Sequence, residues 1–273
     1  MASSELTSPR SARVGSARRL AKRAFRAQDR RFLAEGPQAV REALGVPAGE
    51  PGSVSALFVT RDAAGRHPEL VAAAEALGVD VALASGEVLA GLSQTVTPQG
   101  MVAVCSFLDV PLATVLDDPG RLVVVLAHVR DPGNAGTVIR AADAAGASAV
   151  VITDASVDPF NAKCVRASAG SLWHLPVVVG APLAETLAGL RAAGLRVLAA
   201  DGAGERDLDD ALDDGSLAVP TAWVFGNEAW GLPPETVAAC DEAVRVPLHG
   251  RAESLNLATA AAVCLYASAR AHR

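Results

Sequence analysis

The chain has 273 residues, which is long enough for two modest domains, each with its own core. A hydrophobic share of 51% and a charged share of 20% exclude a disordered chain. No window approaches about eighteen uninterrupted apolar residues, and the basic N-terminus lacks the apolar core of a secretory signal. The four cysteines lie far apart, which favours reduced thiols and gives no metal-site pattern. We therefore expect a cytoplasmic protein with no membrane partner and no metal.

Positive charge is concentrated at the N-terminus. Residues 1–31 carry nine basic and two acidic side chains, so they contribute +7 to a net charge of −6 and leave −13 for the remainder. A cationic arm on an acidic body indicates a polyanionic partner at that end. A solvated, frayed terminus would have the same charge, so charge alone leaves both interpretations open.

The first half of the chain predicts a small α/β domain. Residues 30–45 indicate a lead-in segment and a short helix. Strands are then expected at 54–59, 79–83 and 101–105, with helices near 68–77 and 86–91. This alternation indicates a small parallel or mixed sheet covered by helices. Two prolines and three aspartates break the pattern at 109–120, and we place the domain linker there.

The second half predicts a larger α/β domain with a mostly parallel sheet. It opens with a continuous apolar run at 121–129, which is typical of a strand buried on both faces. Further strands are expected at 148–153, 174–179, 195–200, 221–226 and 242–246, with helices between them. Ligands of such sheets bind beyond the carboxyl ends of the strands, so the loops at these ends are candidates for chemistry.

The first such loop, "RDPGNAGTVIRAADAAGA" at 130–147, leads into a helix. We expect a turn at Asp131-Pro132-Gly133, a cap at Asn134, and Arg140 in the first or second helical turn. A helix N-terminus behind such a loop suits a phosphate or carboxylate, although the spacing matches neither GxGxxG nor the Walker pattern. A capped helix with Arg140 in solvent explains this loop equally well.

Two further loops carry polar residues at equivalent positions. In "WVFGNEAWGLP" (223–233), Gly226 and Gly231 permit tight backbone geometry, and Glu228 stands at a strand end, although a surface turn with a solvated glutamate is the alternative. In "VPLHGRAESLNLATAAAVCLYA" (246–267), capping of the helix accounts for Ser254 or Asn256 but not for both. Three such loops at one edge of a sheet can converge on a single pocket.

The stretches "DPGNAGTVIRAADAAGA", "VFGNEAWGLP" and "VPLHGRAESLNLATAAAV" resemble, in order and spacing, the three signature motifs of the SpoU (TrmH-type) RNA ribose 2′-O-methyltransferases of the SPOUT superfamily. Residues 30–107, with "RRFLAEGPQAVREAL" and "TVTPQGMVAV", look like the N-terminal substrate-binding domain of that family. We accordingly divide the chain into a basic arm (1–31), an RNA substrate-binding domain (32–108), a linker (109–120) and a SPOUT methyltransferase domain (121–273).

The resemblance implies a C-terminal α/β domain whose mostly parallel sheet is threaded as a deep trefoil knot, an exception to the rule that chains are not knotted. It also implies a homodimer whose active sites are completed by the partner, with S-adenosyl-L-methionine as the methyl donor. RNA is the implied substrate, bound through the N-terminal arm and domain. We favour rRNA because that domain is similar to the one in family members that act on rRNA.

The resemblance also assigns individual positions. The catalytic positions of the family motifs match Asn134, Arg140, Glu228, Ser254 and Asn256. The cofactor-contacting positions match Gly226, Val246 and Leu255, and the strand end at Ala200 is expected to add to that wall.

The chemistry requires a ribose 2′-hydroxyl, a poor nucleophile, to lose its proton as it attacks the methyl group. Arg140 is the candidate to contact this hydroxyl, but a guanidinium with a pKa above ~12 is an awkward general base. Our hypothesis is that Arg140 positions the hydroxyl and an adjacent RNA phosphate, while phosphate or water shares in removing the proton. Asn134 would orient Arg140 or the ribose, and the other three catalytic positions would fix the loops and the target nucleotide.

Two other functions stay open. "LRVLAADGAGERD" (195–207) is faintly similar to the cofactor loop of a Rossmann-fold, nucleotide-dependent enzyme, but it lacks the third glycine. A non-enzymatic RNA-binding protein would keep the basic arm and the small domain, with no reason to keep Arg140, Glu228, Ser254 and Asn256 together. Binding of S-adenosylmethionine separates the methyltransferase from both.

Overall fold

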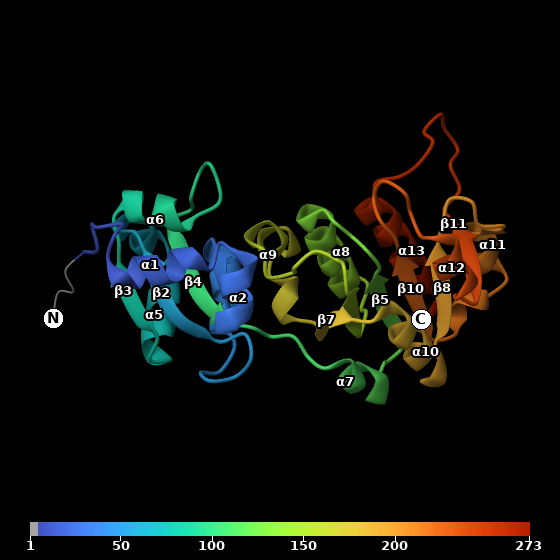
Figure 1. Cartoon of the computed structure of the whole chain (residues 1–273), viewed down its shortest axis with the longest axis horizontal. Coiled ribbons are helices and arrows are strands. Elements are labelled where there is room, and N and C mark those ends of the chain that lie inside the picture. Colours follow the sequence, from blue (N-terminus) through green and yellow to red (C-terminus); the bar gives the residue numbers. More distant parts are fainter. Residues whose placement is uncertain (1–4) are drawn as a thin grey trace. The chain divides into compact units, whose positions relative to one another are not determined.

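Two β-sheets organise the chain in the computed structural model, which describes residues 5–273 (Figure 1). One compact unit, unit 1, comprises the residues up to Leu108 together with Phe160–Trp173. The other, unit 2, comprises Asp109–Pro159 and His174–Arg273. Unit 1 holds a four-stranded sheet and unit 2 a seven-stranded sheet.

The sheet of unit 1 is mixed. Its strands lie in the order β1 (Arg31–Glu35), β4 (Met101–Ser106), β2 (Val54–Val59) and β3 (Asp80–Leu83). β4 runs antiparallel to β1 and β2, whereas β3 is parallel to β2. The connecting helices are α3 (Pro37–Leu44), α4 (Arg61–Arg66), α5 (Pro68–Ala76) and α6 (Gly86–Leu92). The sequence predicts only a lead-in segment where β1 forms, because a strand buried on both faces shows no apolar–polar alternation.

The N-terminal segment folds as part of unit 1. It contains helices α1 (Ala12–Arg19) and α2 (Arg23–Asp29), and Ser11 caps α1 by accepting a hydrogen bond from the Val14 N–H (3.3 Å). Val14 and Leu20 are buried in a core cluster that includes residues of α6. The interpretation as a frayed terminus is therefore wrong for residues 5–31, because their apolar side chains give the helices a packed face.

Residues 160–173 also pack with unit 1, although they lie within the range predicted for the methyltransferase domain. Helix α9 (Ala162–Ser168) lies against β1, and a short 3-10 helix (Ser171–Trp173) follows it. Phe160 stacks on Phe107 with ring centroids 3.9 Å apart. The Trp173 indole N–H donates to the Gly52 carbonyl (3.1 Å). Aromatic packing thus attaches a segment of the C-terminal half to the smaller unit.

Every pair of neighbouring strands in the sheet of unit 2 is parallel. The order is β7 (Val177–Ala181), β6 (Ala149–Thr153), β5 (Leu122–Leu126), β10 (Thr221–Phe225), β8 (Arg196–Ala200), β11 (Glu242–Arg245) and β9 (Arg206–Asp207). The predicted strands are present, and β9 adds a two-residue edge strand that is too short to leave a sequence pattern. β5, β6 and β10 are buried along their whole length, as continuous apolar runs indicate.

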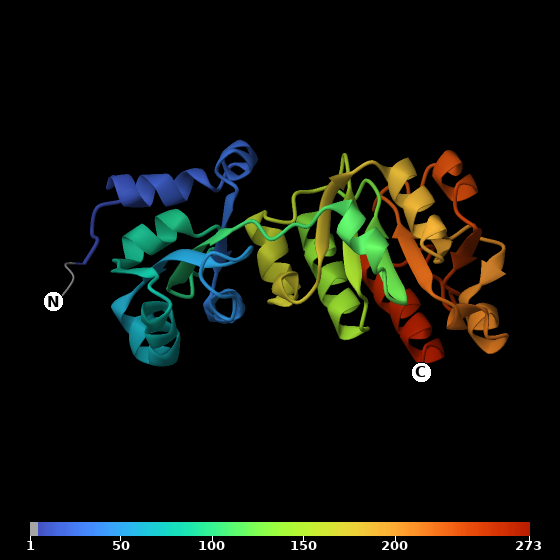
Figure 2. The ribbon, with the colours of Figure 1, turned by 90° about the horizontal axis from the view of Figure 1, so that it is seen from below.

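Helices cover both faces of this sheet (Figure 2). They are α7 (Leu112–Asp117), α8 (Pro132–Ala144), α10 (Leu183–Ala192), α11 (Leu208–Asp213), α12 (Pro234–Ala238) and α13 (Leu257–Ala271). The Trp223 indole N–H donates to the Ser268 hydroxyl of α13 (2.8 Å). The next residue of the strand, Val224, is buried in the same hydrophobic cluster as Leu190 of α10. Successive strand residues point to opposite faces, so the two contacts lie on opposite sides of the sheet. α7 occupies the predicted linker because Val115 is buried in this core.

Among residues 5–273, no helix is long and apolar enough to cross a membrane, and no group of three or more His, Cys, Asp or Glu could hold a metal ion. Cys105, Cys164 and Cys264 are buried and Cys240 is half-buried. Burial raises the pKa of the Cys264 thiol to about 12 and that of the Cys240 thiol to about 11. These two thiols are therefore protonated at neutral pH.

Candidate active site

Neighbouring strands of unit 2 end at the same level of the sheet. Phe225, the last residue of β10, pairs with Leu126 at the end of β5 and with Ala200 at the end of β8. Ala200 also pairs with Val244 in β11. The loops after these strands therefore leave from one edge, which is where open parallel sheets bind their ligands.

The loop after β5 enters helix α8 at Asp131. The Asp131 carboxylate caps the helix by accepting a hydrogen bond from the Asn134 N–H (2.8 Å), and Pro132 follows at the first helical position. The prediction that Asn134 is the cap is therefore wrong, and its side chain in the first turn is available to another partner. Arg140 lies in the third turn rather than the first or second, because α8 begins at Pro132.

Glu228 joins the loop after β10 to the start of α8. Its carboxylate accepts hydrogen bonds from the backbone N–H groups of Arg130 (3.2 Å) and Asp131 (3.0 Å) and from the side-chain amide of Asn134 (3.2 Å). Burial alone raises the pKa of Glu228, but the hydrogen bonds from backbone N–H groups and from Asn134 outweigh it and hold the pKa below its ordinary value. Glu228 is therefore ionised at neutral pH and acts as a hydrogen-bond acceptor.

Asn256 connects the third loop to the same group. Its side-chain oxygen caps α13 by accepting hydrogen bonds from the N–H groups of Ala258 (2.9 Å) and Thr259 (3.3 Å). Its side-chain nitrogen donates to the Asn134 Oδ1 atom (3.1 Å). Both ends of the Asn134 amide are thus engaged. We call Glu228, Asn134 and Asn256 the carboxyl-end network.

The loop that carries Glu228 is tightly folded, as its glycines predict. A Cβ atom on Gly226 would lie 2.3 Å from the Gly231 carbonyl oxygen, a separation that real Cβ atoms do not adopt. Gly231 has a φ of 69°, in the left-handed region that glycine adopts without strain. Substitution at either position would displace Glu228 from its partners.

Two residues that hold these loops together are missed by the sequence reasoning. Asp131 is one, and an aspartate directly before a proline at a helix start is the signal that identifies it. Asn227 is the other: it is buried, and its side-chain amide donates to the His128 carbonyl (2.9 Å). Asn227 and His128 are 99 positions apart in the sequence, so no local pattern predicts their contact.

Arg140 and Ser254 are exposed, and neither forms a hydrogen bond or ion pair with any residue in the range 5–273. The structure thus brings together three of the five predicted catalytic residues and leaves the side chains of the other two available to a ligand. Three of the predicted cofactor positions lie at the ends of neighbouring strands. Ala200 is the last residue of β8, Gly226 directly follows β10 and Val246 directly follows β11. Leu255 precedes the cap of α13 with 36% of its surface exposed.

Comparison with known proteins identifies both halves of the chain. A model of the SpoU rRNA methylase family matches residues 121–266, and a model of RNA 2′-O ribose methyltransferase substrate-binding domains matches residues 33–111. The chain belongs to the SpoU rRNA methylase family. The carboxyl-end network lies within its SpoU methylase domain.

Three SpoU-related proteins match nearly the whole chain. The 23S rRNA (guanosine(2553)-2′-O)-methyltransferase RlmP of Bacillus subtilis is 33% identical over 262 residues, which cover 96% of this chain and 98% of the relative. An AdoMet-bound rRNA methyltransferase from Sinorhizobium meliloti has a TM-score of 0.83 at 32% identity, over 98% of this chain and 97% of that one. The SpoU methyltransferase AviRb from Streptomyces viridochromogenes, in complex with the cofactor AdoMet, has a TM-score of 0.82 at 30% identity, over 96% of this chain and 98% of that one.

Proposed function

We propose that this protein is an S-adenosylmethionine-dependent enzyme that methylates a ribose 2′-hydroxyl of rRNA. The observation that carries the proposal is the carboxyl-end network, in which polar side chains from three loops meet at the ligand-binding edge of a SpoU-family sheet. The names of the relatives from B. subtilis and S. meliloti support rRNA as the substrate. We propose a cytoplasmic location as well, which an rRNA substrate supports.

The same edge suits the methyl donor. Ala200, Gly226 and Val246 present backbone groups at three strand ends. Leu248 and Leu255 are 41% and 36% exposed in the loop before α13, and such apolar surface beside backbone groups fits an adenosine moiety. When bound there, S-adenosylmethionine supplies the methyl group to be transferred.

Arg140 is the residue that we assign to the reacting hydroxyl. Its guanidinium is permanently charged, and it has no partner among residues 5–273 to compete with RNA. It donates hydrogen bonds to the ribose 2′-oxygen and to an adjacent phosphate, and so stabilises the negative charge that develops on the oxygen as its proton leaves. The oxygen–methyl bond would form as the methyl–sulfur bond of the donor breaks. The proton of the hydroxyl passes to phosphate or water. The exposed Ser254 hydroxyl binds the target nucleotide, while the carboxyl-end network fixes the loops.

We also propose a homodimer in which the partner completes each active site. Val263 and Tyr266 on α13 are 40% and 55% exposed and lie three positions apart, so they share one face of the helix. A second copy would cover this apolar face.

A deep trefoil knot is proposed for the chain after β10. It is supported by the return of the chain from β11 to α13, which packs against α8, β5 and β10.

Cations in and beside the N-terminal helices supply the charge for RNA binding. Arg13 pairs with Asp80 and Arg19 with Asp29, so these arginines serve the fold. Five exposed cations have no hydrogen bond or ion pair through their side chains with residues 5–273: Arg10, Arg18, Lys22, Arg23 and Arg31. Their contacts with phosphates would give salt-sensitive affinity without sequence preference.

The Rossmann-fold alternative does not fit the loop after β8. A dinucleotide loop must open directly into a helix, but here β9 intervenes before α11. Gly204 also lies against the backbone of β11, where an added Cβ atom would be 2.7 Å from the Ala243 carbonyl oxygen. That space is taken by the protein itself. Calorimetric binding of S-adenosylmethionine separates the proposed enzyme from a purely RNA-binding protein.

The decisive experiment is single-turnover methylation of rRNA by Arg140→Ala. We expect the rate to fall about 10²–10³-fold, since the variant loses a charged donor aimed at the developing oxyanion. The calorimetric affinity for S-adenosylmethionine should stay unchanged. Arg140→Lys keeps the charge but loses the planar fork of the guanidinium. Its methylation rate should lie between that of the wild type and that of Arg140→Ala.

A near-normal rate for Arg140→Ala with normal cofactor binding would remove Arg140 from the reaction. Substrate rRNA should come from a strain lacking the gene, so that the target is unmodified. Mapping ribose methylation in that rRNA, before and after treatment with the enzyme, identifies the nucleotide.

A further inference from the structure

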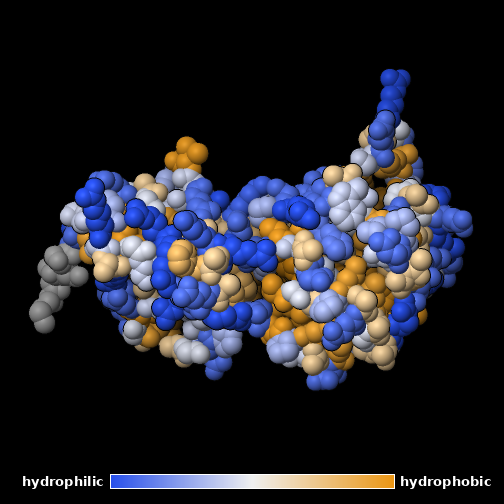
Figure 3. Space-filling model, viewed as in Figure 1, coloured by the Kyte–Doolittle hydropathy of each residue, from blue (hydrophilic) through white to orange (hydrophobic). Residues whose placement is uncertain are grey.

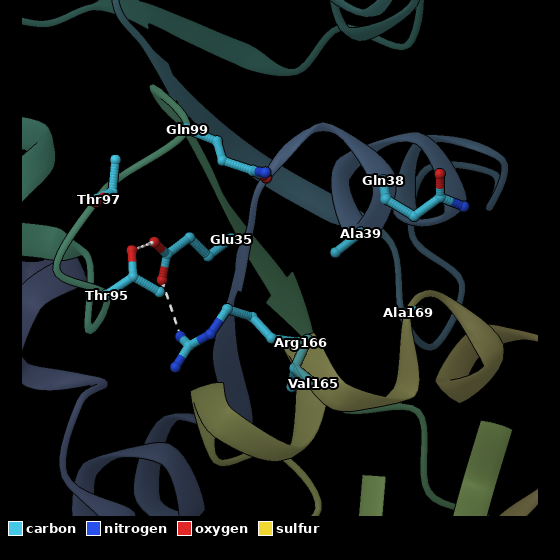
Figure 4. A pocket seen from close by; sticks show the side chains of 9 residues that line it. All are labelled: Glu35, Gln38, Ala39, Thr95, Thr97, Gln99, Val165, Arg166 and Ala169. Atoms are coloured by element: carbon cyan, nitrogen blue, oxygen red, sulfur yellow. Dashed lines mark hydrogen bonds and ion pairs between the residues drawn. The ribbon is translucent and has the colours of Figure 1, made fainter. Parts of the chain in front are cut away.

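Unit 1 contains a cavity of about 280 Å³. Figure 4 shows its walls, which come from the end of β1, the start of α3, the loop between α6 and β4, and α9. The residues that line it include Glu35, Thr97, Gln99, Val165 and Arg166. All of these elements belong to unit 1. Neither the proposed reaction nor the cations of the N-terminal helices use this cavity.

Glu35 organises the cavity without being available to a ligand. Only 5% of its side chain is exposed. Its carboxylate accepts hydrogen bonds from the Ser93 hydroxyl, the Thr95 hydroxyl (2.5 Å) and the Gln94 N–H (3.4 Å). Arg166 donates a fourth, through Nη1 (3.0 Å). A carboxylate with four donors has no hydrogen-bonding capacity left for a ligand. Glu35 instead fixes the loop after α6 and orients the Arg166 guanidinium.

Arg166 retains hydrogen-bonding capacity. Only Nη1 is engaged by Glu35, and its other N–H groups have no partner among residues 5–273. Its side chain is 28% exposed, and Figure 4 shows the guanidinium directed toward Glu35 and Thr95 across the cavity. Thr97 and Gln99 are exposed on the facing loop, and no side-chain hydrogen bond engages them within the described range. One donor held in place by Glu35, on Arg166, and two polar side chains without partners among residues 5–273, Thr97 and Gln99, therefore border the cavity beside the apolar side chain of Val165.

The charge balance selects the kind of ligand. Glu35 neutralises Arg166 at 3.0 Å, so the cavity offers directed donors with little net positive charge. That combination disfavours a phosphate and favours a neutral, planar group that carries acceptors on one edge. The volume lies just below the usual range for ligand pockets, which suits one nucleobase rather than a larger molecule.

The surroundings favour RNA as the source of that base. The loop from Ser93 to Gly100 projects from unit 1 (Figure 1), and Val96 within it is fully exposed. In Figure 3, hydrophobic atoms stand clear of the surface where this loop projects. An unpaired base can leave its stack, enter a pocket and present its edge to an arginine, whereas a paired base cannot. Guanine offers the O6 and N7 acceptors that an arginine fork binds best.

We propose that this cavity binds one unpaired nucleobase of the RNA substrate, with guanine preferred, through donors of Arg166 that Glu35 holds in place. The inference rests on the proposed function, because it assumes that unit 1 binds RNA. It adds a source of selectivity that phosphate contacts do not provide.

The test uses fluorescence anisotropy with the full-length protein and three labelled RNAs. Two are hairpins with the same stem, one with guanines and one with uridines in the loop, and the third is a blunt duplex of equal charge. The wild type should bind the guanine hairpin about tenfold more tightly than the uridine hairpin, since a bidentate arginine contact discriminates by about that factor. The duplex should bind weakest.

Variants locate the effect in the cavity. Arg166→Lys keeps a charge opposite Glu35 but lacks the fork, so it should lose the preference for guanine while the fold is retained. Gln99→Ala leaves the Glu35–Arg166 pair intact and should reduce the preference several-fold. Lys163→Ala is the matched control, because it removes an exposed charge of α9 outside the cavity and should affect both hairpins equally. Thermal unfolding of each variant checks its fold.

Equal binding of the two hairpins by the wild type would overturn the inference, and so would a full guanine preference in Arg166→Lys. Failure of the proposed function has a different signature. A wild type that does not methylate rRNA in the presence of S-adenosylmethionine would refute the enzyme, whatever the hairpins show. Normal methylation without hairpin discrimination would refute only the cavity.

Discussion

Two glutamates, one in each unit, tie separate segments of the chain together in different surroundings. Glu35 of unit 1 is buried, accepts three hydrogen bonds from the loop after α6 and is paired with Arg166. Glu228 of unit 2 is exposed, accepts hydrogen bonds from the start of α8, and has no cation partner among residues 5–273. The two carboxylates have similar numbers of donors but differ in their access to water.

This difference separates a structural role from a functional one. A buried carboxylate must keep its partners, because removal of one member leaves the others without water to replace it. An exposed carboxylate can be solvated when its partners are removed, so its hydrogen bonds add little to stability. We therefore expect the hydrogen bond between Glu228 and Asn134 to serve the position of the loops at the proposed reaction site.

The largest effect on stability is expected for Glu35→Ala. It leaves Arg166 and two hydroxyls without their acceptor, and the free energy of unfolding should fall by about 3 kcal/mol, as for other broken buried pairs. Urea denaturation measures this change. Glu75→Ala, on the exposed side of α5, is the matched control and should change stability by less than about 0.5 kcal/mol. A loss below about 1 kcal/mol for Glu35→Ala would mean that the Glu35–Arg166 pair contributes no more to stability than an exposed ion pair.

Glu228→Gln should show the opposite pattern. The amide keeps the shape of the side chain but cannot accept from every N–H group that the carboxylate binds, so the loops shift. The single-turnover rate should fall by about 10²-fold, while the free energy of unfolding changes by less than about 1 kcal/mol. Glu235→Gln in α12, also exposed, should leave both unchanged. Substantial destabilisation with a normal rate would assign Glu228 to the fold.

Asn256 allows the two roles to be separated within one residue. Asn256→Ala removes both the cap of α13 and the donor to Asn134, so stability should fall by about 1 kcal/mol and the rate by about tenfold. Asn256→Asp keeps a good cap but lacks the donor, so only the rate should fall. Stability from urea denaturation and single-turnover rates should be measured on the same preparations. Full activity in Asn256→Asp would reduce the residue to a helix cap.

The sequence predicts the sheet of unit 2 well because its central strands are continuous apolar runs, as at Leu122–Leu126 and Thr221–Phe225. It misses β1 and β9, which carry no periodic signal. It also fails to assign α9 to unit 1, since nothing local indicates that Phe160 will stack on Phe107. Contacts between distant segments are decided by packing, which local patterns do not encode.

The candidate site divides in the same way. Glycine spacing predicts the tight turn around Glu228, and the Asp-Pro pair could have identified the cap of α8, which the prediction placed at Asn134. The link between Asn134 and Asn256 spans 122 positions and is visible only in the fold. The motifs therefore indicate which residues gather at the edge of the sheet, while the structure shows which of them hold one another.

The contrast between buried and exposed charge recurs among the basic residues of α2. The side chain of Arg26 is buried and donates to the Leu20 and Ala21 carbonyls (both 2.8 Å), whereas that of Arg23 is exposed with no partner in the described range. We therefore expect the triple variant Arg18→Gln, Lys22→Gln, Arg23→Gln to bind RNA with a shallower dependence on salt. The slope of log affinity against log salt should fall by about one for each phosphate that the variant no longer neutralises. Anisotropy titrations at several salt concentrations measure it.

The matched control is Arg13→Gln with Arg19→Gln, in which the substituted cations already pair with carboxylates. Each substitution there also releases an acidic partner, so the salt slope should change less than in the triple variant, while stability falls by at most about 1 kcal/mol per exposed pair. Equal slopes for the wild type and the triple variant would mean that these helices do not contact phosphates. RNA binding would then depend on other surfaces, and the N-terminal cations would serve only the fold and the solubility of the chain.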